Sequence, residues 1–224
     1  MAGASNSFDG GSNGTAITPA NSGSASGTAF SATDSITYSS AQAYRGPLSA
    51  QIAAGAIGYV QYALSGTGTR WARWYARPVS PSNSLIEMAL ANGDMFGLDI
   101  SGGQIILWRN TNFNQNNLDT KTFTLPGGWI RLEMQANSDN SGSATARIFT
   151  APEASTPAIE LSGSDVAVAS SWDAVRFGSV NESSTPGWID SVAWSDQGWI
   201  GPLPGTDVAT PRIPRAATHR AAAW

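Results

Sequence analysis

Two stretches of the chain place aromatic rings beside guanidinium and carboxylate groups, which together can form a shallow sugar-binding surface. Residues 69–77 read Thr-Arg-Trp-Ala-Arg-Trp-Tyr-Ala-Arg, and residues 129–133 read Trp-Ile-Arg-Leu-Glu. At the two-residue period of a β-strand, alternate side chains of each stretch lie on one face. If the two strands share a sheet, they predict a carbohydrate-binding face made of Trp71, Arg73, Tyr75, Trp129, Arg131 and Glu133.

The same residues allow a second interpretation that needs no ligand. Tryptophan and arginine side chains on the outer face of a sheet can pack against one another, form ion pairs and be covered by loops. Such a face stiffens the fold and binds nothing. The sequence leaves both interpretations open. The other tryptophans singled out, which are expected to fill the core or the sheet edges, are Trp172, Trp188, Trp194 and Trp199.

The sequence contains few of the residues that enzymatic catalysis requires. The chain has one histidine, His219, no cysteine and no Gly-x-Ser-x-Gly segment, so a Ser-His-Asp or Cys-His mechanism lacks its residues. A glycoside hydrolase needs two carboxyl groups roughly 5 to 10 Å apart. The sixteen acidic residues are scattered singly, although Glu87 and Glu133 could meet on neighbouring strands. We expect a protein that is not an enzyme, and a glycoside hydrolase is the least favoured alternative.

No cofactor, metal, nucleic acid or membrane is expected to bind. The sequence contains no Walker loop and no EF-hand pattern, and a calcium site built from Asp9, Asn13 or Asp190 has no regular ligand spacing to support it. The net charge of −4 provides no basic surface for nucleic acid. No stretch approaches the roughly 18 apolar residues that a membrane-spanning helix requires.

The composition indicates a β-rich fold. Only 12% of the 224 residues are charged, glycine is abundant, and no amphipathic helical pattern occurs. Short strand patterns recur along the chain, and the clearest alternation puts Ile130, Leu132 and Met134 on a core face. A first strand is expected near residues 5–9, and the Asn-rich residues 110–119 are predicted to form an exposed loop. Together these patterns predict an all-β, two-sheet antiparallel jelly-roll sandwich.

The chain divides into a body and two extended arms. Residues 1–30 are predicted to form an N-terminal arm and first strand packed on the body, and residues 31–205 the jelly-roll domain, which spans about 5–205 with its first strand. Residues 206–224 hold three of the twelve basic residues and one of the sixteen acidic residues. Because this Pro-containing arm is basic, we expect it to dock on an acidic partner surface. Its expected docking residues are Arg212, Arg215, His219, Arg220 and Trp224.

Several segments, taken in order, resemble a known family. They are 8–14 (Phe-Asp-Gly-Gly-Ser-Asn-Gly), 71–75, 129–133, 146–149, 175–178, 188–193 and 198–202. Over about residues 5–203 the chain is similar to the concanavalin-A-like, laminin-G-like jelly-roll proteins encoded among the virion genes of tailed actinobacterial phages. The resemblance implies two curved antiparallel sheets, one of them concave. The Glu-x-Asp-x-x-Glu strand of the related glycosidases and the legume-lectin metal motif are both missing here.

The resemblance implies a non-enzymatic structural or accessory protein of a tailed phage virion, displayed on the capsid or tail surface and anchored by its terminal arms. Its expected partners are other virion proteins, and we expect a homo-oligomer or many copies in the particle. Its location would be the virion, assembled in the host cytoplasm and extracellular after lysis. The alternative is a receptor-binding or carbohydrate-binding adhesin module of the same virion, with a host-surface glycan as partner.

Overall fold

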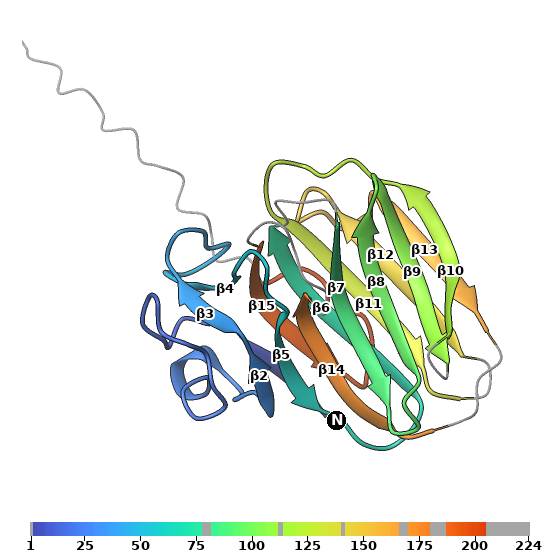
Figure 1. Cartoon of the computed structure of the whole chain (residues 1–224), viewed down its shortest axis with the longest axis horizontal. Helices are drawn as coiled ribbons and strands as arrows, with labels where there is room; N and C mark the ends of the chain where they lie inside the picture. Colours follow the sequence, from blue (N-terminus) through green and yellow to red (C-terminus); the bar gives the residue numbers. More distant parts are fainter. Residues whose placement is uncertain are drawn as a thin grey trace, which may run out of the picture.

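The computed structural model describes residues 2–77, 82–111, 114–139, 142–165, 170–179 and 187–204. These residues form two antiparallel sheets packed face to face (Figure 1). The strands are β1 (Gly3–Asn6), β2 (Ala32–Asp34), β3 (Ile36–Ser39), β4 (Ser49–Ile52), β5 (Gly58–Ala63), β6 (Thr69–Arg77), β7 (Ser82–Leu90), β8 (Met95–Ser101), β9 (Gln104–Thr111), β10 (Asn114–Thr122), β11 (Ile130–Asn137), β12 (Ser143–Phe149), β13 (Ile159–Ser164), β14 (Trp172–Ser179) and β15 (Gly187–Ser195).

Sheet A has the strand order β13-β12-β11-β6-β15-β4-β3, and β1 also pairs with β15. Sheet B has the order β10-β9-β8-β7-β14-β5-β2. Each sheet contains neighbouring strands that are far apart in the sequence, such as β6 and β15 in sheet A and β7 and β14 in sheet B, as expected when long connections pass between two packed sheets. The predicted all-β, two-sheet antiparallel jelly-roll sandwich is therefore confirmed.

The core lies between the inner faces of the two sheets. Sheet A contributes Trp74 from β6 and the predicted inward residues Ile130, Leu132 and Met134 from β11, all fully buried. Sheet B contributes, among others, Val60, Met88, Phe96, Leu98, Leu107 and Phe177. Alternate residues of each strand point into this layer, and those between them point to the outer faces. Burial of these apolar side chains is the main force that holds the sheets together.

One predicted loop is a strand. The Asn-rich residues 110–119 were expected to be exposed loop, but Asn114–Thr122 forms β10 at the edge of sheet B. Its hydrogen bonds go to the backbone of β9, and the side chains of Gln115, Asn116 and Asn117 are exposed. An edge strand with exposed polar side chains lacks the apolar alternation by which a strand is recognised. The prediction failed because the strand is held by pairing with β9 and by side-chain bonds such as that from Asn116 Nδ2 to Asp165 Oδ2 at 2.9 Å, neither of which leaves an apolar pattern in the sequence.

The N-terminal segment contributes to the core. Its first strand, β1, ends at Asn6, earlier than the expected 5–9, and pairs with the C-terminal half of β15. Beyond it the side chains of Phe8, Ile17 and Phe30 are buried in the core. In Figure 1 this blue segment curls around one end of the sandwich beside β2 and β3. Three apolar side chains thus hold a glycine-rich and serine-rich segment against the sheets.

The described residues contain one helical element, the three-residue 3-10 helix η1 (Ser24–Ser26). No helix in the described ranges is long and apolar enough to cross a membrane.

Candidate functional site

The six residues predicted to bind sugar do come from adjacent strands. β6 and β11 pair directly, which places Arg73 opposite Glu133 and Tyr75 opposite Arg131 on the outer face of sheet A. Trp71 lies opposite Gln135 on the same face, and Trp129 directly precedes β11. The side chains therefore gather on one face.

That face is covered. The exposed fractions of Arg73, Tyr75, Arg131 and Glu133 are only 4%, 0%, 1% and 2%. One cover is the C-terminal strap, residues 196–204, which follows β15 and crosses the outer face of sheet A. The other is the loop 40–47, whose Tyr44 ring stacks on Tyr75 with 4.1 Å between ring centroids. Four of the six predicted residues are therefore buried beneath the chain itself, and only Trp71 and Trp129 are partly exposed.

The strap is fixed by the buried polar groups that it covers. The Arg73 Nη1 group donates a 3.2 Å hydrogen bond to the carbonyl oxygen of Gly201. The backbone N–H of Leu203 donates to the Tyr75 hydroxyl at 2.9 Å, and Arg45 Nη1 donates to the carbonyl of Pro204 at 2.8 Å. These bonds fit the second interpretation of the face, in which its arginines and aromatic residues hold covering segments in place.

Ion pairs satisfy part of the buried charge. Arg131 Nε lies 3.2 Å from Glu133 Oε1, with both side chains buried. Burial raises the pKa of Glu133, although Arg131, Arg73, Arg147 and the backbone N–H of Gly201 act in the opposite direction. Burial likewise lowers the pKa of Arg73. Removing these charges from water costs free energy. Loss of one partner would leave the other charge buried and uncompensated, which would destabilise the fold.

Glu87 and Glu133 do not form a carboxyl pair, because Glu87 is on β7 of sheet B and Glu133 is on β11 of sheet A. Glu87 belongs to a polar row on the outer face of sheet B. Paired positions across all seven strands place in line Ala32, Gln61, Arg176, Glu87, Gly97, Trp108 and Asn117.

The polar row of sheet B is internally bonded. Arg176 Nε donates to Gln61 Oε1 at 2.9 Å, and Arg176 Nη1 lies 3.3 Å from Glu87 Oε2. The Trp108 ring lies over Gly97, where a side chain would overlap it. Trp108 and Glu87 are only 4% and 8% exposed. Burial raises the pKa of Glu87, while Arg176 opposes the rise. The residue types of this row, an aromatic ring with amide, carboxylate and guanidinium groups, could bind a sugar. However, the ring of Trp108 is buried, so a sugar could not stack on it.

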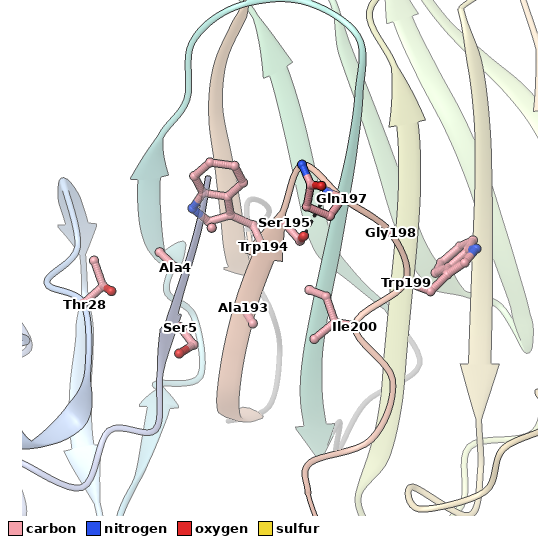
Figure 2. Close-up of a pocket in the computed structure, with 11 residues that line it drawn as sticks. Ala4, Ser5, Thr28, Ala193, Trp194, Ser195, Gln197, Gly198, Trp199 and Ile200 are labelled. Carbon is pink, nitrogen blue, oxygen red and sulfur yellow. Dashed lines mark hydrogen bonds between the residues drawn. The ribbon is translucent and has the colours of Figure 1, made fainter. Parts of the chain in front are cut away.

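An open groove lies on the outer face of sheet A, beside the covered cluster. Its volume is about 600 Å³. Figure 2 shows β1 and β15 side by side, and the start of the strap leaving β15. The residues that line it are Gly3, Ala4, Ser5, Thr28, Ala193, Trp194, Ser195, Gln197, Gly198, Trp199 and Ile200.

Strand register explains the shape of the groove. Gly3 pairs with Ser195, and Ser5 pairs with Ala193, so small side chains form its floor. The intervening Trp194 packs against the core instead, in agreement with its predicted role. The strap runs beside this floor. Its Trp199 ring stacks on Arg147 of β12, with 4.0 Å between the ring centroid and the guanidinium carbon. A depression therefore remains between β1 and the strap.

Sequence reasoning missed this groove. Gly3, Ser5, Ala193 and Ser195 are ordinary small residues, and only the pairing of β1 with β15, almost the whole chain apart, brings them together. The one available signal was the small-residue content of both segments, which also occurs in turns.

Asp190 on β15 is a fully buried carboxyl group. Burial raises its pKa to about 7, and the nearby Asp9 adds to the rise. Hydrogen bonds from the backbone N–H of Tyr44 at 2.8 Å and from the Ser191 hydroxyl at 3.1 Å oppose it. No group of three or more Asp, Glu, His or Cys side chains suited to a metal ion occurs among the described residues.

The predicted docking residues of the C-terminal arm lie outside the described residues. They are Arg212, Arg215, His219, Arg220 and Trp224. Pro204 is the last described residue, and its carbonyl oxygen accepts a hydrogen bond from Arg45 Nη1.

No family model and no curated protein sequence matches the chain. Among solved structures, it is similar to a protein of unknown function from Shewanella oneidensis MR-1, with a TM-score of 0.52, 12% identity, and coverage of 86% of this chain and 84% of that one. Mouse laminin alpha1 chain domains LG4-5 match with a TM-score of 0.46 and 13% identity over 65% of this chain and 40% of theirs. The exoplasmic/lumenal domain of VIP36, solved in a Ca²⁺/Man3GlcNAc-bound form, matches with a TM-score of 0.47 and 8% identity over 77% and 85%. These likenesses concern the jelly-roll fold alone.

Proposed function

We propose that this protein is a non-enzymatic carbohydrate-binding module whose binding surface is the groove between β1, the end of β15 and the strap. The observation that carries the proposal is the groove itself, about 600 Å³ of open space on the outer face of sheet A. Ligand sites in proteins commonly have volumes of roughly 300 to 1,000 Å³. The groove is in this range, whereas the predicted face beside it is closed.

The chemistry of the groove favours a saccharide over an apolar ligand. Ser5, Thr28 and Ser195 offer hydroxyl groups, and Gln197 offers an exposed amide. Hydroxyl and amide groups can both donate and accept hydrogen bonds, as the hydroxyl groups of a sugar require. Trp199 adds a partly exposed aromatic side chain at the edge. The paired positions of the floor, Gly3 with Ser195 and Ser5 with Ala193, have small side chains.

The groove favours binding over hydrolysis. Its lining residues include no Asp, Glu or His side chain. Hydrolysis of a glycosidic bond uses two carboxyl groups placed on either side of that bond. We therefore expect a bound glycan to be released unchanged.

A glycan array with the full chain, followed by titration of the best hit, tests this proposal. We expect Ser195→Trp, which fills the groove, to weaken binding at least tenfold. Ser162→Trp is the matched control, because Ser162 is an exposed serine on β13 of the same sheet. Near-ultraviolet circular dichroism shows whether both variants fold. Binding that survives Ser195→Trp and disappears in Trp71→Ala would return the site to the face first predicted.

The setting that we propose for this module is the surface of a tailed phage particle, where it would act as an accessory or adhesin protein held by its basic arm. The support is the sequence resemblance over about residues 5–203 and the basic composition of residues 206–224. Other virion proteins would be its partners. Truncation after Gly205 should give a folded protein that no longer enters particles, as measured by mass spectrometry of purified virions. Full occupancy of the truncated protein would contradict docking by the arm.

A further inference from the structure

A row of alternating charges crosses the outer face of sheet A and stops beside the groove. Strand pairing places in line Glu160 (β13), Arg147 (β12), Glu133 (β11), Arg73 (β6), Ala193 (β15) and Ser5 (β1). The first four alternate acid, base, acid and base, and Arg147 Nε lies 2.7 Å from Glu160 Oε2. The next acidic position in this order would be Ala193, which has only a methyl group. The row therefore ends on the positive charge of Arg73.

The charge of Arg73 is buried opposite Glu133, but no carboxylate oxygen of the described residues forms an ion pair with it within 4.0 Å. Three arginines are buried in the described part of the chain, and Arg109 and Arg131 each have a carboxylate within 4.0 Å. Arg73 donates instead to two backbone carbonyls, from Nη1 to Gly201 and from Nη2 to Ser191, each at 3.2 Å. Its buried Nε–H has no acceptor among the residues that the structure describes. A buried guanidinium whose hydrogen bonds go only to neutral groups, and which shares its nearest carboxylate, Glu133, with Arg131, can still accept a further negative charge.

A recess of about 120 Å³ lies against Arg73. Its lining residues are Ser5, Asn6, Ser7, Ser26, Arg73, Ser191, Val192 and Leu203. Ser5 lines both this recess and the groove. The Ser26 hydroxyl oxygen accepts a hydrogen bond from the Gly10 N–H at 2.6 Å, which leaves its own proton available to another acceptor. The recess thus combines a positive charge with hydroxyl donors.

A local irregularity of β15 shapes the recess. The register between β15 and β6 shifts between Asp190 and Ala193, and Ser191 has a φ of 48°. Such a bulge redirects one residue's carbonyl and opens the strand locally. The Ser191 carbonyl is the one that accepts from Arg73. Hence the guanidinium is held in a fixed position at the wall of the recess.

We propose that this recess binds a carboxylate group and that the natural ligand is an acidic saccharide, with its sugar ring in the groove and its carboxylate beside Arg73. The saccharide half of this inference rests on the proposed function, and the carboxylate half does not. Arginine is the side chain best suited to a planar carboxylate, because its donors lie in one fixed plane. A carboxylate there would continue the alternation of charges at the position where Ala193 provides none.

Titration of the full chain with three ligands at constant ionic strength tests the inference. Isothermal titration calorimetry with sodium glucuronate, glucose and sodium acetate separates the two halves. We expect glucuronate to bind at least tenfold more tightly than either glucose or acetate. Equal affinities for glucuronate and glucose would overturn the carboxylate site and leave the proposed function standing. Binding of acetate with equal affinity to glucuronate, and no binding of glucose, would retain the carboxylate site and overturn the saccharide.

Two variants locate the site. Ser5→Phe should block the mouth of the recess and reduce glucuronate affinity at least tenfold, and Ser5 is exposed, so we expect the fold to survive. Ser162→Phe, on β13 of the same sheet, is the matched control and should bind as the wild type does. Arg73→Lys keeps the charge and loses the planar fork, so it should also weaken glucuronate binding. If Arg73→Lys fails to fold, Ser5→Phe still decides: unchanged glucuronate affinity in that variant overturns the proposed location.

Discussion

Arg73 on β6 and Glu133 on β11 lie directly opposite each other, and neither exposes more than 4% of its surface. Side chains at paired positions of antiparallel strands are near neighbours, and opposite charges there attract. Arg131 competes for the same carboxylate, with its Nε 3.2 Å from Glu133 Oε1. One buried carboxylate therefore faces two buried guanidinium groups.

Glu133→Gln should destabilise the protein by about 3 kcal/mol, because it leaves Arg73 and Arg131 buried without a counter-charge. Urea unfolding followed by tryptophan fluorescence measures this loss. Glu153→Gln is the control, since Glu153 pairs with Arg45 at 3.0 Å while its side chain is 46% exposed. Exposed pairs contribute about 1 kcal/mol or less. Equal losses in the two variants would mean that burial does not strengthen the cluster.

The strap should open locally when one of its anchors is removed. Tyr75→Phe deletes the hydroxyl that accepts the Leu203 N–H at 2.9 Å. The lost hydrogen bond costs about 1 kcal/mol, and we expect a fivefold to tenfold faster hydrogen exchange at the Leu203 amide. The amide of Leu132 on the buried β11 is the internal control and should keep its protection. Uniform acceleration of both would mean that the hydroxyl supports the whole sheet and not the strap.

The sequence contained enough to predict β6, whose observed bounds, Thr69–Arg77, are those of the stretch singled out, and the inward face of β11. The alternation of apolar and polar residues is visible within a single strand, so such a strand can be predicted from its own sequence. The sequence could not show that the strap covers the predicted site. The hydrogen bonds of Gly201 with Arg73 and of Leu203 with Tyr75 each join residues 128 positions apart. The edge strand β10 was not predicted for a different reason. It pairs with β9, but its own asparagine-rich sequence is typical of a loop.

Gly97 in the polar row of sheet B lies against the Trp108 ring, so a side chain at this position should destabilise the fold. The Trp108 ring occupies the space where a methyl group would lie, and the ring is itself buried. Gly97→Ala should therefore cost about 1 to 3 kcal/mol through overpacking, measured by thermal unfolding. Gly187→Ala on β15 is the matched control, since nothing lies within 4 Å of a methyl group there. A similar melting temperature for both variants would show that Trp108 can move away freely.

Asp190 predicts a pH dependence of stability. Its pKa in the folded state is about 7, and burial is the main cause. Between the ordinary pKa near 4 and pH 7, the folded state holds a proton that the unfolded chain has released. The stabilising contribution of this proton is therefore complete below pH 4 and is lost as the pH rises through 7. The loss amounts to a few kcal/mol.

Asp190→Asn should remove this part of the pH dependence. The side-chain oxygen of asparagine can still accept the backbone N–H groups of Tyr44 and Arg45, and its amide can donate to the Ser191 hydroxyl. We expect the variant to match the wild type near pH 4 and to exceed its free energy of unfolding near pH 8. Buried Glu87 and Glu133, whose pKa values are also raised, would keep a smaller slope of the same sign. Urea unfolding at pH 4, 6 and 8 measures the difference, and parallel pH profiles of the two proteins would show that Asp190 is ionised in the folded state throughout.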